Sequence, residues 1–344
     1  MKEKLELRIL HDIACIAQLL PEWNELWQRC PYATTFQRPE WLFSWMEIFQ
    51  PAAPVFVEAR SAGRLVALIP LLIYERESQQ VLALMGGGVS DYLDVLVDPE
   101  LTEPVLRQVQ DFLVEQVSGW DILEFTDLSC NSPLLDAWPN MQSGEPHDAC
   151  PVLPLGAAGE SLTEFVPAHK LRNLRNARRR LDRAGGGELE VANTASINRL
   201  LEEMIRLHES RWEQTSQPGV LSDPRVQRFH RRVAPLLLSR GVLRLYALRF
   251  KSHYIAALYA FFEANAAYGY LQGYDSRFRE LSPGTQILGA VIEDAARLGL
   301  SKVDFLRGRE EYKYAWGARD EQTFRVHQER SAIVSTAHGS RVAA

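Results

Sequence analysis

The sequence lacks the signatures of several large protein classes. Its four cysteines are widely spaced, with no CxxC pair and no histidine cluster nearby. This usage fits a reducing compartment and gives no indication of zinc, so we expect no metal cofactor. All four cysteines also lie in the first half of the chain, which argues against a thiol nucleophile in the second half.

Long apolar runs are also missing. None reaches the ~18–20 residues that a membrane span needs, and the N-terminus, MKEKLELRIL, has no apolar region of a signal peptide. We therefore expect a cytoplasmic protein with no membrane span. A net charge of −6 excludes a generally basic nucleic-acid binder but does not exclude a local basic patch.

The elements that the sequence does predict occur twice in the same order. At 344 residues the chain exceeds one ordinary core, and two domains are expected. Each half begins with two helices and continues with a β-hairpin (55–74 and 243–262) and a further strand. An amphipathic helix (103–117 and 285–298) and a last strand follow. The repetition predicts an α/β fold with mixed sheets, built from two copies of one plan.

Proline and glycine place the expected boundaries. Pro151, Pro154 and Gly156 interrupt the chain after the first half. We expect a first domain over 1–155, a linker with a basic helix over 156–188 and a second domain over 189–330. Residues 331–344 are small and without periodicity, which predicts a flexible tail.

A Gly/Ser/Pro loop leads into the helix of the second half. The segment Arg279-Glu-Leu-Ser-Pro-Gly284-Thr-Gln286 turns a strand into a helix whose first N–H groups point back into the turn. Such a junction can hold the pyrophosphate of a cofactor. Pro283 and Gly284 are also typical of an ordinary helix cap. Both interpretations stay open from these residues alone.

Polar and aromatic residues follow the last strand of the second half. Asp304 and Arg307 come at its C-terminal end, where α/β folds usually bind ligands, or they form an ion pair that holds the loop. In the next residues, a carboxylate or tyrosine would act as a base and Lys313 would stabilise an oxyanion. The alternative is a charged loop packed by its aromatic residues.

These motifs resemble those of a known family. Ser282-Pro-Gly-Thr-Gln-Ile-Leu288, Asp304-Phe-Leu-Arg-Gly308 and Glu311-Tyr-Lys-Tyr-Ala-Trp-Gly-Ala318 look like the C-terminal signature of the CelD/BcsL family of GNAT-type acyltransferases, which is associated with cellulose biosynthesis. The resemblance implies two GNAT-like domains in tandem, an architecture shared with the Fem aminoacyltransferases. Arg279–Gly284 is similar to the GNAT cofactor loop Q/R-x-x-G-x-G/A, with Ser282 in place of the first glycine.

The resemblance also implies ligands and site residues. The co-substrate would be acetyl-CoA or another acyl-CoA, and the acceptor an amine or hydroxyl of a sugar, an exopolysaccharide or a cell-envelope precursor. We expect the cofactor to contact Tyr270, Gln272, Arg279, Ser282, Gly284, Thr285 and Gln286. The expected catalytic residues are Lys313, Tyr312, Asp304 and Glu311, and the expected acceptor-binding residues are Arg307, Glu310 and Trp316. The first half has only Gly86-Gly87-Gly88 at the matching place, so we expect it to be degenerate and to bind no cofactor.

A basic helix leaves a second interpretation open. Lys170–Arg183, KLRNLRNARRRLDR, has leucines on one face and arginines on the other. The basic face is either a solvated helix surface or a site for an anionic partner, such as the CoA phosphates or RNA. RNA would favour Fem-like aminoacyl transfer from charged tRNA, although no aromatic residues that would stack bases are interleaved. A third alternative is a non-catalytic GNAT-fold subunit of a polysaccharide-synthesis system.

Overall fold

One order of strands occurs twice in the chain, which confirms the predicted α/β fold built from two copies of one plan. The computed structural model describes residues 5–138, 144–157, 160–212 and 219–333. These residues form two compact units, the first from 1–148 and 322–344 and the second from 149–321. In each unit a hairpin is followed by a strand, a long helix and a strand parallel to the one before that helix.

The first unit contains a sheet covered on both faces. Its strand order is β1 (Leu5–Leu10), β2 (Ala53–Ser61), β3 (Arg64–Arg76), β4 (Gln79–Leu84), β6 (Ile122–Leu128) and β13 (Arg319–Glu329), with the short β5 (Leu96–Val97) beside β3. On one face lie α1 (Ile13–Gln18), α2 (Leu20–Arg29) and α3 (Pro39–Phe49), where Trp23 packs against Phe56. The core on the other face includes α4 (Thr102–Gln116) and α5 (Pro133–Ala137).

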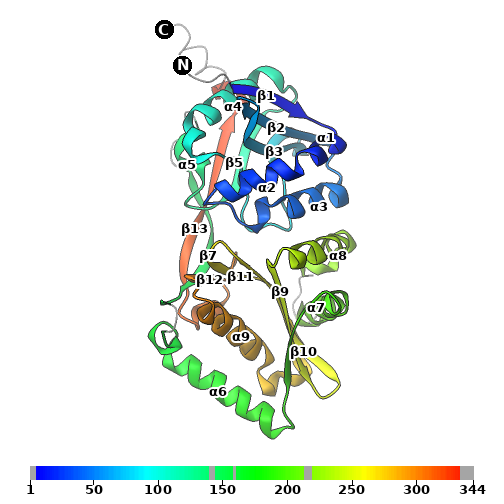
Figure 1. Cartoon of the computed structure of the whole chain (residues 1–344), viewed down its shortest axis with the longest axis vertical. Helices are drawn as coiled ribbons and strands as arrows, with labels where there is room; N and C mark the ends of the chain where they lie inside the picture. The colour runs from blue at the N-terminus through cyan, green and yellow to red at the C-terminus, as the bar shows by residue number, and fades with distance from the viewer. Residues whose placement is uncertain (1–4, 139–143, 158–159, 213–218, 334–344) are drawn as a thin grey trace. The chain divides into compact units, whose positions relative to one another are not determined.

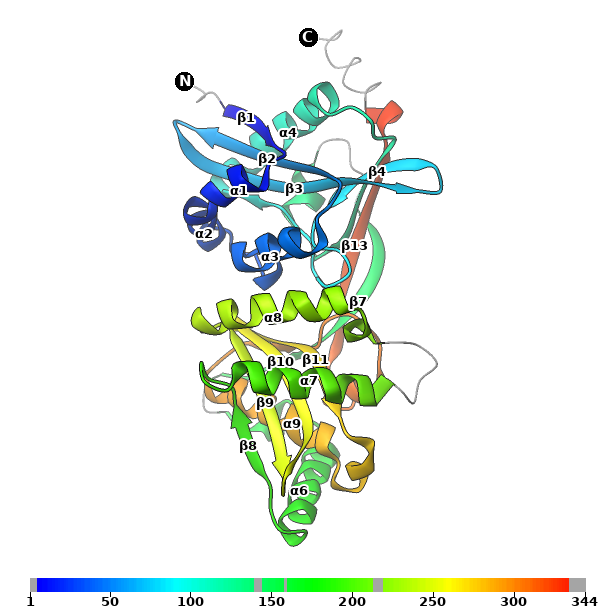
Figure 2. The same ribbon diagram turned by 90° about the vertical axis from the view of Figure 1, so that its right-hand side faces the viewer.

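The second unit repeats this plan. Its strand order is β7 (Glu145–Pro154), β12 (Lys302–Asp304), β11 (Ala266–Tyr274), β10 (His253–Glu263), β9 (Leu243–Phe250) and β8 (Glu188–Val191). Helices α7 (Ile197–Trp212) and α8 (Pro224–Ser239) cover one face of the sheet (Figure 2). On the other face α9 (Pro283–Arg297) lies beside α6 (Ala168–Arg183) (Figure 1). The short α10 (Glu311–Tyr314) follows β12.

The compact units differ from the predicted segments in two places. Helix α6 is no linker, because Leu171, Leu174 and Leu181 are buried in the core of the second unit. Strands β7 and β13 were not predicted, and β13 places residues 322–329 in the first unit, where it pairs with β6. A strand that completes the sheet of a distant segment leaves no local sequence signal. Of the predicted flexible tail, residues 334–344 lie outside the described part of the chain.

Candidate functional site

A pocket opens at the start of α9 in the second unit, where the sequence predicts the cofactor loop. Its volume is about 320 Å³. Seven of the predicted site residues line it: Gln272, Arg279, Ser282, Gly284, Thr285, Tyr312 and Trp316. The remaining lining residues are Lys170, Tyr274, Pro283 and Leu288. Two cations and no carboxylate therefore stand among the described lining residues, which favours an anionic ligand.

The loop before α9 reverses the chain through Ser282. Asp275 caps the short helical turn Ser276–Leu281 by accepting from the amide of Arg277 at 3.0 Å. Ser282 then takes a left-handed conformation with φ 50°, which a glycine adopts without strain and which costs other residues about 1 kcal/mol. The hydroxyl of Ser282 accepts a hydrogen bond from Arg180 of α6 at 2.8 Å.

The amide of Gly284, in the first turn of α9, has no backbone acceptor among the described residues. The amides of Thr285 and Gln286 donate to the carbonyl of Ser282 at 3.1 and 3.2 Å, and Pro283 has no N–H. Among the described residues no backbone partner reaches the amide of Gly284, so this N–H and the positive end of the helix dipole are available to an anion. A Cβ at Gly284 would lie 3.1 Å from Nε2 of Gln272, which itself donates to the Gly284 carbonyl at 3.0 Å.

A β-bulge separates Tyr270 from the pocket. Leu271 pairs with Tyr259 and Gly269 pairs with Ala260, so Tyr270 is the extra residue of β11. The bulge reverses the alternation of side chains. Gln272 therefore faces the pocket, whereas the ring of Tyr270 packs 5.2 Å from that of Phe261, among aromatic residues under α8. The prediction that Tyr270 contacts the cofactor side of the sheet is wrong for this reason.

Strands β11 and β12 separate beside this bulge. Their parallel pairing ends at Tyr268 and Asp304, whereas β11 continues to Tyr274. Beyond the pairing, the amide of Phe305 donates to the carbonyl of Pro151 in the segment of β7. Beyond Tyr268, therefore, β11 runs past the pocket without being paired to β12.

Lys313, the side chain from which the sequence predicts catalysis, is a structural brace. It is buried, and its ammonium donates to the carbonyls of Leu306, Arg307 and Gly308 at 3.1, 2.7 and 3.0 Å. It also pairs with Glu310 at 2.9 Å. These contacts use all the donors of the ammonium. Lys313 therefore fixes the loop after β12 and does not line the pocket, which corrects the predicted oxyanion role.

Five other predicted residues also lie outside the pocket wall. Asp304 is buried and accepts from the amide of Leu306 at 2.8 Å, so it shapes the turn after β12. Gln286 is buried and donates to the carbonyl of Leu281 at 2.7 Å, which braces the loop. Glu311 is exposed at the start of α10, and Arg307 contributes its carbonyl to Lys313. Glu310 is held by the same lysine.

Helix α6 forms a wall of the site that the sequence interpretation assigned to a linker. Gly289 of α9 brings the helices together, because a Cβ there would meet Leu174 at 2.8 Å. Arg178 makes two hydrogen bonds to Glu293 of α9 at 2.8 and 2.6 Å, and Arg180 donates to the carbonyl of Glu280 at 2.8 Å. These two arginines hold α6 against α9 and the loop before it.

Lys170 is the charged residue among the four lining residues that the sequence did not predict. Its Nζ lies 4.7 Å from the centre of the Trp316 ring, and burial lowers the pKa of this lysine. A signal was present: Lys170, Leu174, Ala177 and Leu181 recur at spacings of four, three and four residues. A lysine in line with the buried residues of a helix points into the protein, whereas the neighbouring arginines do not.

The described residues contain neither a cluster of metal ligands nor a membrane-spanning helix. Across the described ranges, no three His, Cys, Asp or Glu side chains form a group suited to a metal ion. In the same part of the chain, no helix is both long enough and apolar enough to span a bilayer.

One segment of the chain matches a known family, and solved structures share the fold of most of the chain. Residues 168–314 match the family model described as acetyltransferase (GNAT) domain, and every lining residue of the pocket except Trp316 lies in this range. This part of the chain is therefore similar to a GNAT acetyltransferase domain. No curated protein sequence matches it significantly.

Solved structures show how far the fold extends. The crystal structure of FemX is 11% identical with a TM-score of 0.63, covering 92% of this chain and 96% of FemX. The C-terminal domain of a putative lysylphosphatidylglycerol synthetase from Agrobacterium fabrum is 12% identical with a TM-score of 0.57, covering 95% and 96%. L-PGS from Bacillus licheniformis is 11% identical with a TM-score of 0.52, covering 83% and 86%. At such identities these similarities concern the fold alone.

Proposed function

We propose that this protein transfers an acyl group from acyl-CoA to an amine or hydroxyl acceptor at the pocket beside α9. The observation that supports this most strongly is the pocket itself. It lies at a helix N-terminus, has Lys170 and Arg279 but no carboxylate among its described lining residues, and belongs to the segment that matches a GNAT domain. Acetyl-CoA is the simplest donor of this class.

The residues present fit such a co-substrate. The amide of Gly284 and the side chain of Arg279, of which 81% is exposed, would hold the pyrophosphate. The part of β11 beyond its pairing with β12 would lie beside the pantetheine arm. Acyl-CoA supplies a thioester, from which an acyl group can pass directly to a nucleophile. The acyl group would lie beside the bulge at Gly269–Leu271.

Tyr312 is the acid–base side chain in this arrangement. Transfer to an amine removes one proton from the attacking nitrogen and delivers one to the departing sulfur. Of the predicted catalytic residues, Tyr312 is the one that lines the pocket, whereas Lys313 and Asp304 are held by the backbone around β12. A phenol can donate and accept protons, so Tyr312 suits delivery of the proton to sulfur.

The acceptor is proposed from the resemblance of residues 282–318 to the CelD/BcsL family. It would be a sugar hydroxyl or amine of an exopolysaccharide or cell-envelope precursor. Turnover of acetyl-CoA with such acceptors, followed as release of free thiol, tests this proposal. If acyl-CoA binds but none of these acceptors accelerates thiol release, the acceptor class is wrong and the donor site stands.

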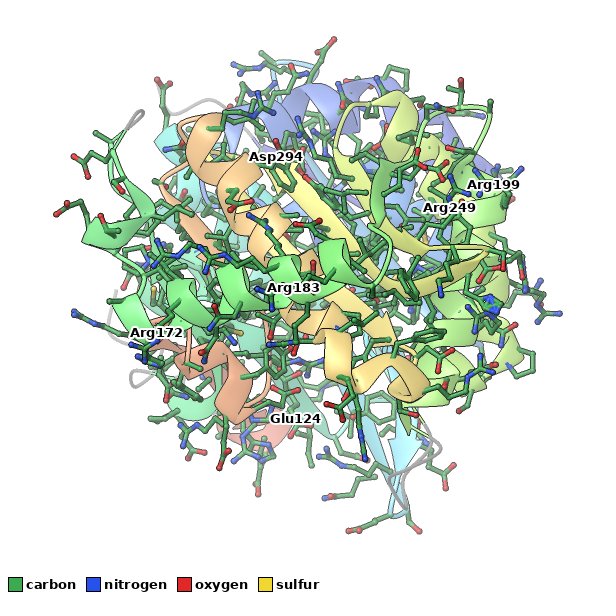
Figure 3. The ribbon with its side chains drawn as sticks, turned by 90° about the horizontal axis from the view of Figure 1, so that it is seen from below. Glu124, Arg172, Arg183, Arg199, Arg249 and Asp294 are labelled. Carbon is green, nitrogen blue, oxygen red and sulfur yellow. The ribbon has the colours of Figure 1, made fainter. Side chains whose placement is uncertain are left out.

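A second candidate is Fem-like aminoacyl transfer from tRNA, favoured by the exposed side of α6. Arg172, Arg175, Arg179 and Arg183 are exposed at spacings of three, four and four residues, and Arg172 and Arg183 lie toward opposite ends of α6 (Figure 3). Among the described residues none of the four forms an ion pair or side-chain hydrogen bond. We name these four residues the arginine stripe. Such a row suits a phosphate backbone.

The salt dependence of RNA binding tests this candidate. If tRNA is the donor, changing Arg172, Arg175 and Arg179 to Gln should weaken tRNA binding and reduce the slope of log K against log salt by about 2, at about 0.7 per contact. Arg225, Arg228 and Arg232 of α8, also exposed, are changed to Gln as the control. Wild-type protein that shows no binding of tRNA above that of a random RNA contradicts the candidate.

A further inference from the structure

Two lysines of the second unit, the buried Lys313 and the half-buried Lys170, have opposite surroundings. Lys313 has three carbonyls and one carboxylate around its ammonium. The half-buried Lys170 has the ring of Trp316 at 4.7 Å, and within the described chain no carbonyl, hydroxyl or carboxylate lies within hydrogen-bond or ion-pair distance of its Nζ. Removing an ammonium from water without such partners is unfavourable, and a bound anion would compensate it.

The pocket wall offers Lys170 no counter-charge. The described lining residues include no Asp or Glu, and burial alone lowers the pKa of Lys170 without an opposing carboxylate. A lysine placed over a tryptophan face can still attract an anion, because the ring contact leaves its N–H donors directed elsewhere.

Lys170 is also separated from the loop that holds the first anion site. Arg180 reaches Ser282 and Glu280 from the far end of the same helix. Lys170 precedes Arg180 by ten residues, which corresponds to about 15 Å along a helix. Trp316, under the Lys170 ammonium, lies against the position of Gly289, well inside α9. The pocket therefore has one positive centre at the start of α9 and another at Lys170.

We propose that Lys170 is a second anion-binding point of the pocket, which meets a phosphate or carboxylate group of the donor other than the pyrophosphate. This inference rests on the proposed acyl-CoA function. Two sources supply the required chemistry: the 3′-phosphate of CoA, or a carboxylate at the end of a dicarboxylic acyl group. In the second case Lys170 determines which acyl group is transferred.

Binding of four compounds to wild type and Lys170→Met tests the proposal by calorimetry. The compounds are CoA, 3′-dephospho-CoA, acetyl-CoA and succinyl-CoA. Methionine suits the apolar row of α6, so the variant should fold. If Lys170 meets the 3′-phosphate, affinity falls about tenfold or more for every compound except 3′-dephospho-CoA, as expected for a charged hydrogen bond. If it meets an acyl carboxylate, the loss is confined to succinyl-CoA.

Two further variants separate charge from packing. Lys170→Arg keeps the charge and should retain most of the affinity. Lys251→Met is the matched control, because Lys251 also lies over an aromatic ring, 5.0 Å from that of Phe250, but outside the pocket lining.

Three results would overturn the proposal. Unchanged affinity of Lys170→Met for all four compounds refutes it while the acyl-CoA function stands. An equal loss for all four assigns Lys170 to the shared pyrophosphate or to packing, and no second point exists. Wild-type protein that binds none of the four refutes the proposed function and this inference together.

Discussion

Helix α4 of the first unit and helix α9 of the second hold the same place in the repeated plan, but they begin in different chemical surroundings. Helix α4 of the first unit is preceded by Asp98 and carries Glu103 in its first turn. Asp98 accepts from the amide of Glu100 and pairs with Arg29 at 3.0 Å. Helix α9 of the second unit has no acid in its first turn and begins Pro283-Gly284.

This difference shows how one plan serves two purposes. A carboxylate near a helix N-terminus satisfies free amides and the helix dipole from within the chain. In the first unit Asp98 satisfies the amide of Glu100 in the turn before α4, and Glu103 lies near the positive end of the helix dipole. In the second unit the amide of Gly284 has no backbone partner among the described residues.

The largest expected effect concerns the stability of the second unit. Lys313→Ala removes the ammonium that joins three carbonyls and leaves those carbonyls without their donor. We expect the free energy of unfolding of this unit to fall by about 3 kcal/mol or more. Hydrogen exchange should rise in residues 302–316 and stay unchanged in β2 and β3. A variant of normal stability that has lost turnover would restore the catalytic role predicted from the sequence.

The next effect concerns catalysis. Tyr312→Phe removes the hydroxyl from the pocket wall and keeps the ring. We expect kcat and kcat/KM to fall together by about 10²-fold, with the Kd for acyl-CoA unchanged. Tyr314→Phe is the control, because its hydroxyl donates to Asp320 at 2.6 Å and Tyr314 is not among the lining residues. A loss below about threefold for Tyr312→Phe would assign this residue to packing.

A smaller effect distinguishes the units by pH. Burial raises the pKa of Asp94 in the first unit to about 7, and burial lowers the pKa of His230 in the second unit to about 3. The raised acid stabilises the first unit below its ordinary pKa of about 4, and this contribution is lost as pH rises toward 7. The depressed histidine stabilises the second unit above about pH 6.5, and this contribution is lost as pH falls.

The pH responses should therefore run in opposite directions. Between pH 6.5 and 5 the second unit should lose about 2 kcal/mol of stability through His230, and the first unit should gain through Asp94. Hydrogen exchange that resolves the two units measures both. Asp94→Asn should flatten the response of the first unit only, and His230→Phe that of the second only. Identical pH profiles in wild type and variants would contradict these assignments.

Much of the fold follows from local patterns. The helices and hairpins have the periodicity and turn residues that define them, so α4, α9 and both hairpins lie within a few residues of their predicted ranges. Strands β1, β7, β8 and β13 were missed, since each is completed by pairing with distant residues. Strand β5 is short because it pairs with β3 over only two residues.

The candidate site divides along the same line. Arg279, Ser282, Gly284 and Thr285 line the pocket as predicted, because one turn of consecutive residues determines where they lie. The prediction for Tyr270 failed because a β-bulge turns its side chain away from the pocket. The prediction for Lys313 failed because its ammonium is bound by buried carbonyls. Neither feature has a sequence signature. Lys170 lies far from the loop in sequence and reaches the pocket only because α6 packs against α9.

The stoichiometry and position of acyl-CoA binding test the contrast between the units most directly. Titration of wild type with acetyl-CoA should show one equivalent bound. Gly284→Val should weaken it more than tenfold, because side-chain atoms there would meet Gln272 and shield the amide. Gly87→Val, at a site where a Cβ meets nothing within 4 Å, should bind like wild type. A second equivalent that disappears in Gly87→Val, or unchanged affinity in a folded Gly284→Val, would contradict the assignment of the donor site to the second unit alone.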